Sequence, residues 1–424
     1  MPALRFRFLI AVLTAFAATI PRARAEDGHS MTPAQIIAAI ERADSGDTNI
    51  YGMHDFHVMH GNANSDLQRL MILRFEATQA IMESIDRMDG DPTRAALQSA
   101  LYGVLGFVKD PASIDWLRGK LRSDQAEAFY RHYLPTWQTR LDGFGSWEWL
   151  TGRDKWIAFW RDAFDAERSP ERRAELLCVL CHFDDASVVM FFEGRRTAAT
   201  DPKEALIVES YLDAHDIAAD DKRVQWAVDS LTSSQVNLEF LISMARGLRH
   251  QAFVPFLVGI SDIVDPNTTP AYYPAERALQ PITFECNMHG KVAWQRWFTT
   301  HGKEGRRAWT QRDLNAFHET LARNTADAVK EFDHRVYCWN EIALLPFIES
   351  DLLPHAEFHS DIAGWINLTY TDFYRERLRP LAERLGRSGH LDDVAQRLLQ
   401  ERGYLPGSRK PDWAKTVEYA NSRL

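Results

Sequence analysis

Apolar positions recur along most of this chain at spacings of three and four residues, which is the period of an α-helix. Residues 32–44, "TPAQIIAAIERAD", place Thr32 as a helix cap and Pro33 in the first turn, where proline fits. Residues 65–88 continue the helical pattern without a break for about six turns. No convincing run of alternating β-branched residues occurs. The pattern therefore predicts an all-α chain.

Several segments repeat the same order of apolar helix, turn and second apolar helix. Residues 102–121 and 177–196 align so that Gly103 and Gly106 fall on Cys178 and Cys181, and each passes through an acidic turn. Residues 210–231 and 243–260 have the same shape, and the turns, near Asp185, Ala218 and His250, are about 33 and 32 residues apart. Paired helices at that period predict an α-solenoid of stacked antiparallel pairs.

This pattern resembles that of HEAT-repeat proteins, and in particular of exported bacterial ones. The repeat units of that family carry an Asp-Pro or similar turn, as at Asp110-Pro111. A second similarity is an aliphatic-Thr pair followed by three aromatic residues on one helical face. It occurs twice, as Leu150, Thr151, Trp156, Phe159 and Trp160, and as Ile282, Thr283, Trp294, Trp297 and Phe298. The resemblance covers residues 91–305 and implies a HEAT-like solenoid there.

The first 25 residues have the features of a secretory signal peptide. Two arginines precede the apolar run from Phe8 to Ile20, and an Ala-Arg-Ala site ends at Ala25. We therefore expect a periplasmic or secreted protein with no membrane span after cleavage. The predicted organisation is a signal peptide (1–25), N-terminal helices with a His/Met-rich loop (26–90), HEAT-like helical repeats (91–305) and a C-terminal helical region (306–424).

Charge and cysteine content narrow the classes of function. The net charge of −10 argues against nucleic acid as a partner, because the phosphate backbone binds positively charged surfaces. Four cysteines in a chain of 424 residues do not make a disulfide framework. Cys178, Cys181, Cys286 and Cys338 allow three complete pairings, and the sequence alone leaves them open.

Cys178, Cys181 and His182 spell C-x-x-C-H, the pattern of covalent haem c attachment in exported proteins. The alternative is that both cysteines pack between helices as small apolar residues, since the aligned repeat has Gly103 and Gly106 at the same places. Packing is the preferred interpretation, and haem binding remains an alternative.

A second candidate cofactor site is the segment "MHDFHVMH". Met53, His54, His57, Met59 and His60 provide thioether and imidazole ligands, which suit copper, and imidazole also suits zinc. The competing interpretation is a polar loop whose histidines are solvated or hydrogen-bonded. No cofactor is expected, and copper or haem c is the alternative.

The thirteen tryptophans raise one enzymatic alternative, a helical carbohydrate-active enzyme. Asn367, Tyr370 and Tyr374 form the best stretch for such a site, but no pair of acids converges with them in the sequence. The preferred interpretation is a non-catalytic solenoid that binds a protein partner, as a scaffold, adaptor or immunity-type protein, through its concave face.

Overall fold

The computed structural model describes residues 31–43, 67, 69–71, 73–123, 126–138, 150–183, 185–234, 238–260, 274–286, 288–369 and 374–406. All regular elements in these ranges are helices and none is a strand, so the predicted all-α fold class is confirmed for this part of the chain. None of the described helices has the length and apolar character needed to cross a membrane. The chain divides between Ser113 and Ile114 into two compact units, and this division falls within the predicted repeat region.

The first unit is built around α4. Its helices are α2 (Pro33–Ala43), α4 (Phe75–Arg87) and α5 (Ala95–Val108), with short 3-10 turns η1 (Pro92–Arg94) and η2 (Pro111–Ser113). Both α2 and α5 pack against α4. The predicted start of α2 is confirmed: the Gln35 N–H donates to Thr32 Oγ1 at 3.3 Å, and the Thr32 N–H donates to Gln35 Oε1 at 2.8 Å. This reciprocal pair is a capping box.

The prediction of an unbroken helix over residues 65–88 is wrong at Arg74. Its φ is 52°, and α4 begins only at Phe75. The Arg74 N–H still donates to the Leu70 carbonyl at 3.1 Å, so this residue with a positive φ ends one helical turn before the next begins. The Arg74 guanidinium lies 5.3 Å from the centroid of the Phe75 ring. A non-glycine residue in such a sparsely populated backbone region costs about 1–3 kcal/mol. The spacing of hydrophobic residues carries no signal for this change of backbone.

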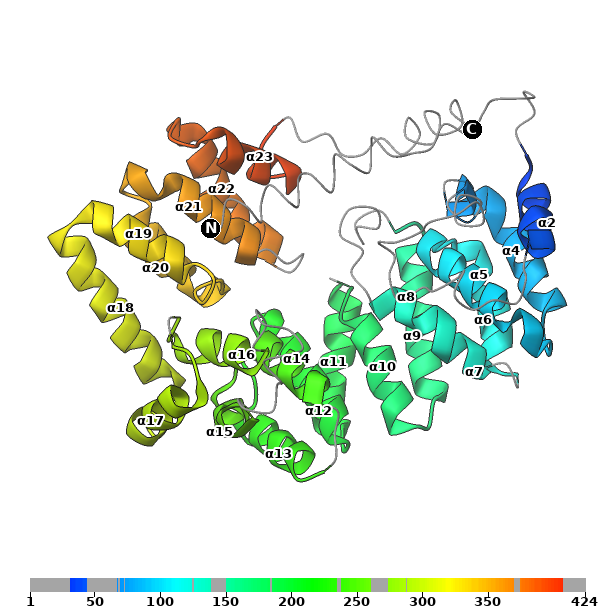
Figure 1. Cartoon of the computed structure of the whole chain (residues 1–424), viewed down its shortest axis with the longest axis horizontal. Helices are drawn as coiled ribbons and strands as arrows, with labels where there is room; N and C mark the ends of the chain where they lie inside the picture. The colour runs from blue at the N-terminus through cyan, green and yellow to red at the C-terminus, as the bar shows by residue number, and fades with distance from the viewer. Residues whose placement is uncertain are drawn as a thin grey trace. The chain divides into compact units, whose positions relative to one another are not determined.

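The second unit contains most of the described helices. The first group is α6 (Ile114–Leu121), α7 (Ala126–Ala128), the π-helical turn η3 (Phe129–Tyr133), α8 (Leu134–Gln138), α9 (Arg153–Ala166), α10 (Pro170–Leu180), α11 (Ala186–Ala198), α12 (Pro202–Ala214), α13 (Asp221–Thr232), α14 (Leu238–Leu248), η5 (Gln251–Phe253), α15 (Val254–Ile260), α16 (Pro274–Thr283) and α17 (Lys291–His301). Within it, α10 packs against α12, α12 against α14, and α14 against α16 (Figure 1).

The remaining helices of the second unit follow a less regular order. They are α18 (Arg306–Arg323), α19 (Thr325–Arg335), η6 (Ile342–Leu344), α20 (Leu345–Phe347), the π-helical turn η7 (Ile348–Leu352), η8 (Ala356–Phe358), α21 (His359–Thr369), α22 (Arg375–Ser388) and α23 (Asp393–Glu401). Helix α21 packs against both α22 and α23, and α18 against α19. One core cluster joins α12 to the start of α18, and a second extends from Phe284 to Tyr404.

The predicted turns are found between helices, and acidic side chains hold two of them. Asp185 caps α11 by accepting the Ser187 N–H at 2.8 Å, and Asp220 caps α13 by accepting the Lys222 N–H at 3.0 Å. The third turn, at His250, is capped by an imidazole: Nδ1 accepts the Ala252 N–H at 3.1 Å. Each cap satisfies a backbone N–H that the helix itself leaves free, so the polar residue fixes where the second helix starts.

Both predicted aromatic triplets lie on buried helical faces. Trp156, Phe159 and Trp160 of α9 have no exposed surface, and Trp294 and Trp297 of α17 are buried. Phe298 is half-buried against the same core. The i, i+3, i+4 spacing places these rings on one side of each helix, where they fill the core.

Candidate functional site

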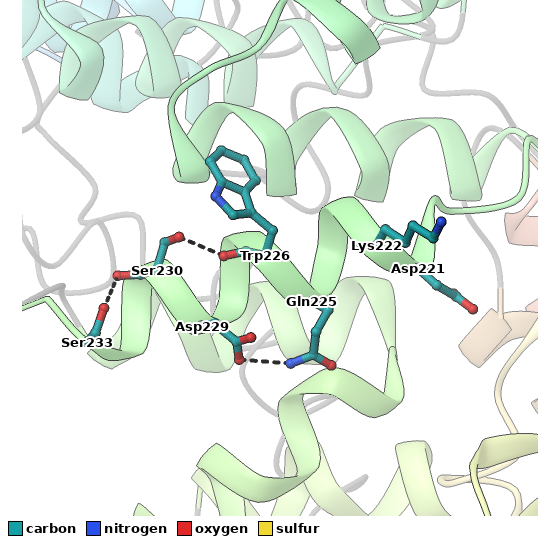
Figure 2. A pocket seen from close by; sticks show the side chains of 7 residues that line it. All are labelled: Asp221, Lys222, Gln225, Trp226, Asp229, Ser230 and Ser233. Atoms are coloured by element: carbon teal, nitrogen blue, oxygen red, sulfur yellow. Dashed lines mark hydrogen bonds between the residues drawn. The ribbon is translucent and has the colours of Figure 1, made fainter.

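The outer face of α13 carries an exposed tryptophan. Val224, Ala227, Val228 and Leu231 are buried on the opposite face of this helix, which packs against α12. Seven residues line a shallow, open depression on the outer face, as Figure 2 shows: Asp221, Lys222, Gln225, Trp226, Asp229, Ser230 and Ser233. The amphipathic sequence of α13 thus buries one side of the helix and leaves an indole on the other.

Trp226 is 41% exposed, whereas the other described tryptophans are buried or half-buried. The Arg223 guanidinium lies 5.7 Å from the centroid of its ring. Below the ring, the Ser230 hydroxyl donates to the Trp226 carbonyl at 2.7 Å, and Gln225 Nε2 donates to Asp229 Oδ1 at 2.8 Å (Figure 2). The rim is therefore ordered by bonds within one helix, and the ring itself is available for contact.

Charged side chains line this depression together with the indole of Trp226. Asp221 and Asp229 are its acids and Lys222 its base, so the lining carries a small negative charge. His250 Nε2 lies 2.7 Å from Asp221 Oδ1, but the Asp221 side chain remains 77% exposed. A general acid or base works in a site that excludes water and positions a substrate. An open helix face with one aromatic ring instead suits contact with another macromolecule.

A second polar site lies where the ends of several helices meet in the second unit. Arg249 follows α14, Arg306 begins α18, and Asn340 and Glu341 precede η6. Arg249 Nη2 donates to Asn340 Oδ1 at 2.5 Å, and its Nη1 lies 3.7 Å from Glu341 Oε2. Arg306 donates to the same Glu341 oxygen. Two guanidinium groups therefore share one carboxylate that is 12% exposed.

Neighbouring groups at this second site have shifted pKa values. Burial, opposed by the Ala219 N–H and the Arg306 guanidinium, raises the pKa of the Asp213 carboxyl. Burial and the Asp213 and Asp216 carboxylates raise the pKa of the Tyr374 hydroxyl to about 12. Arg249 has a φ of 50°, so its backbone is left-handed. Since each arginine faces an acid, we interpret this cluster as a network that fixes the helix ends.

The ionisation of Asp361, on α21, should lower the stability of the protein between about pH 4 and pH 6. Burial, reinforced by the carboxylates of Asp333 and Asp392, raises its pKa to about 6. Because the folded-state pKa lies above the unfolded value, the group favours folding below about pH 4 and loses that contribution as the pH rises through about 6.

We therefore predict that Asp361→Asn raises the free energy of unfolding by about 1 kcal/mol at pH 8 and changes it little at pH 4. The value at pH 8 is reduced because solvent screens this partly exposed group. Urea unfolding of both proteins at the two pH values measures the difference. Equal effects of the substitution at pH 4 and pH 8 would contradict the prediction.

The C-x-x-C-H residues lie at the end of α10. Cys178 is within the helix, Cys181 is its C-cap, and all three side chains, including His182, are partly buried. Burial, with the Glu175 carboxylate, raises the pKa of the Cys178 thiol to about 11, and burial raises that of Cys181 well above its usual value. These surroundings disfavour the thiolate, the form that acts as nucleophile or metal ligand. Packing of the two cysteines stays the prediction here, and haem attachment stays its alternative.

The other predicted site residues are only partly described. Met53, His54, His57, Met59 and His60 lie outside the described residues, as do the signal segment and Tyr370. Among described residues, no group of three or more His, Cys, Asp or Glu side chains could hold a metal ion. Asn367 Oδ1 accepts a hydrogen bond from Arg402 Nε at 2.8 Å, and Tyr374 borders the second polar site.

Comparisons with protein-family models, with curated proteins and with solved structures find no match. The geometry of the chain itself therefore carries the functional argument. The sequence analysis did not identify Trp226, because it considered the thirteen tryptophans together and did not place each one on a helix face. The signal was available: at 3.6 residues per turn, Trp226 falls on the polar side of α13, with Lys222, Asp229 and Ser230.

Proposed function

We propose that this chain is an exported HEAT-like solenoid that binds a protein partner, as a scaffold, adaptor or immunity-type protein, without catalysing a reaction. The packing of α10 on α12, α12 on α14 and α14 on α16 supports the repeat arrangement, since each contact skips one helix along the chain. Capped turns at Asp185, Asp220 and His250 support the pairing of helices. Stacked pairs expose extended surfaces that such proteins use for binding.

The observation that carries the proposal is the exposure of Trp226 on α13, the second helix of its pair. A tryptophan that is 41% exposed contributes less to folding stability than the buried tryptophans do. At protein interfaces, however, tryptophan is enriched among the residues that contribute most of the binding energy. Its ring lies in a shallow depression whose rim is polar. That combination of an aromatic centre and a polar rim matches the anatomy of a protein–protein interface.

Charge suggests the character of the partner. Asp221 and Asp229 line the same depression as the Trp226 ring, and the whole chain has a net charge of −10. A partner segment with basic side chains would therefore be attracted to this face, and its lysine or arginine groups could pair with the two carboxylates at the rim. The partner we expect is a protein that presents a basic patch.

We predict that Trp226→Ala weakens partner binding about 30-fold or more, since losing an aromatic anchor at an interface costs about 2 kcal/mol or more. A photo-crosslinking amino acid at Gln225, next to the ring, should trap the partner in cells. The same amino acid at Lys330 on α19, which is 79% exposed, is the matched control. The trapped protein is then purified and its affinity for both forms of the chain is measured.

The expected result is one discrete adduct at Gln225 that disappears in the Trp226→Ala background and never forms at Lys330. The stability of the variant should match that of the unchanged protein, because the ring is not part of the core. A purified partner that binds the variant as tightly as the unchanged chain would contradict the proposal.

A further inference from the structure

The outward position that Trp226 occupies on α13 holds a large apolar residue on the neighbouring second helices as well. On each of three consecutive second helices, a buried valine is followed two positions later by such a residue. A helix turns by about 100° per residue, so the later side chain lies on the far side of its helix from the valine. The pairs are Val188 and Met190 on α11, Val224 and Trp226 on α13, and Val254 and Phe256 on α15. We call Met190, Trp226 and Phe256 the apolar row.

Polar contacts show that the helices of the apolar row are neighbours. Arg196 of α11 and Arg223 of α13 reach the same Glu209 carboxylate on α12. Arg223 Nη2 also donates to the Ala199 carbonyl at the end of α11, at 2.5 Å. Helix α13 packs against η5, the turn from which α15 continues. Since packed helices lie about 8–10 Å apart, the row crosses its three helices in steps of about that length.

The apolar row is exposed and has two ends. Met190 is 64% exposed and Trp226 is 41% exposed, whereas Phe256 is half-buried against the core. The corresponding position holds Ala158 on α9 and Arg296 on α17, two positions after the first tryptophan of each helix. Ala158 is small and Arg296 is charged, so the row is confined to α11, α13 and α15. Single exposed apolar residues are ordinary, but a patch of them on adjoining elements marks an interaction site.

Acidic side chains accompany the apolar row. Glu193 on α11 and Asp229 on α13 each follow a residue of the row by three positions, which makes them its neighbours on the helix surface, and both are exposed. Asp221, nearer the start of α13, is 77% exposed. By contrast, Arg195 and Arg196 of α11 are bound to glutamates of α12. The surface around the row is therefore negative, and it complements a basic occupant.

We propose that the occupant of the apolar row is a basic amphipathic helix of the partner protein, which lies across α11, α13 and α15. In an α-helix, every seventh residue returns to nearly the same face after about 10.5 Å, which matches the step of the row. In a β-strand, residues on one face recur at about 7 or 13 Å, which does not match. Apolar residues seven positions apart would therefore meet Met190, Trp226 and Phe256 in turn. This inference rests on the proposed function and specifies the segment that the partner contributes.

The acids of α13 fit the width of such a helix. Asp221 and Asp229 are eight positions apart, about 12 Å along the helix axis, and Trp226 lies between them. An α-helix with its side chains is about 10–12 Å wide. A partner helix that crosses α13 over the indole would cover the ring with its apolar face, while lysines or arginines on its two flanks reach the two carboxylates.

The test extends the photo-crosslinking at Gln225 to the helices on either side. The same amino acid is placed in the full chain at Gly194 on α11 and at Gly259 on α15, where an added side chain meets no atom within 4 Å. Adducts formed in cells are digested, and the trapped residues are identified by mass spectrometry. We expect one partner at all three positions, trapped through a single basic segment of about 15 residues. The trapped residues should follow one another at intervals of about seven.

The outcomes separate this inference from the proposed function. A partner trapped at Gln225 but at neither Gly194 nor Gly259 would overturn the extended site and leave binding at Trp226 intact. Trapped residues about three positions apart would indicate a polyproline II segment instead of a helix. Capture of the chain itself, from a second copy or from its own residues 407–424, would give the row a different occupant, and either finding overturns the proposal. Absence of adducts at all three positions would overturn both this inference and the proposed function.

Two exposed apolar residues provide a matched pair for affinity measurements with the purified partner. Met190→Ala removes one end of the apolar row and should weaken binding about fivefold. Val292 on α17 is 68% exposed but lies outside the row, so Val292→Ala should change the Kd by less than about twofold. Both changes are on the surface and should leave the unfolding midpoint in urea unaltered. Equal affinities of the two variants for the partner would overturn the proposal.

Discussion

Replacing Trp160 by alanine should lower the free energy of unfolding by about 3–5 kcal/mol. Trp160 has no exposed surface, and its ring centroid lies 4.8 Å from that of Phe159 and 5.1 Å from that of Trp137. The ring centroids of Phe129 and Tyr133, which complete the cluster, lie 6.0 and 6.3 Å from that of Trp160. Truncation removes the largest side chain from a close-packed core and leaves a cavity that its neighbours fill only in part.

Two comparisons isolate the packing contribution at this position. Trp160→Phe should cost about 2 kcal/mol or less, because a ring remains and the buried Trp160 Nε1 has no hydrogen-bond partner to lose. Trp226→Ala should change stability by less than about 0.5 kcal/mol, since that ring is largely outside the core. Urea unfolding followed by far-ultraviolet circular dichroism measures all three. Similar losses for Trp160→Ala and Trp226→Ala would contradict this account of the core.

Glu209→Gln should destabilise the protein by about 3 kcal/mol through the loss of a buried charge. Glu209 on α12 has no exposed surface, and Arg196 on α11 donates to it from Nη2 at 2.6 Å and from Nε at 3.1 Å. Arg223 Nε on α13 lies 3.7 Å from Glu209 Oε1, and the Asp220 N–H donates to Oε2 at 2.9 Å. The carboxylate thus connects three consecutive helices.

Glutamine retains the shape of this side chain but leaves the two arginines without their counter-charge. Removing one partner of a buried ion pair costs about 3–5 kcal/mol, and the lower end applies here because both arginines remain 24% exposed. The matched control is Glu376→Gln on α22, where a 77% exposed glutamate pairs with Arg379. That exposed pair contributes less than about 1 kcal/mol. The interpretation fails if the two glutamine variants have the same unfolding midpoint in urea.

Local sequence features were sufficient to place many of the helices. Thr32 and Pro33 marked the start of α2, and Asp185 marked the start of α11, because a cap needs only the side chain and the backbone next to it. The aromatic triplet of α9 was correctly assigned to one face, since helical spacing fixes which side chains share a side. The break at Arg74 escaped prediction because arginine has no intrinsic preference for a positive φ.

The candidate sites depended on the packing of whole helices as well as on residue spacing. Periodicity predicts which helix face is polar, but the exposure of Trp226 depends on whether another helix covers that face. Likewise, Cys178 and Cys181 stand out in the sequence because C-x-x-C-H is one short motif, whereas Arg249, Arg306 and Glu341 are far apart in the sequence and meet only in the folded chain.

By itself, the sequence determined that the described part of the chain is helical, where several helices begin, and that the rings of each aromatic triplet share one helical face. These properties follow from interactions within one or two turns, where the backbone geometry is fixed. Only the tertiary structure decided that Glu209 meets Arg196 and Arg223, and that Arg249 and Arg306 share the Glu341 carboxylate. Such contacts depend on how whole helices pack, and many sequences with the same periodicity could pack differently.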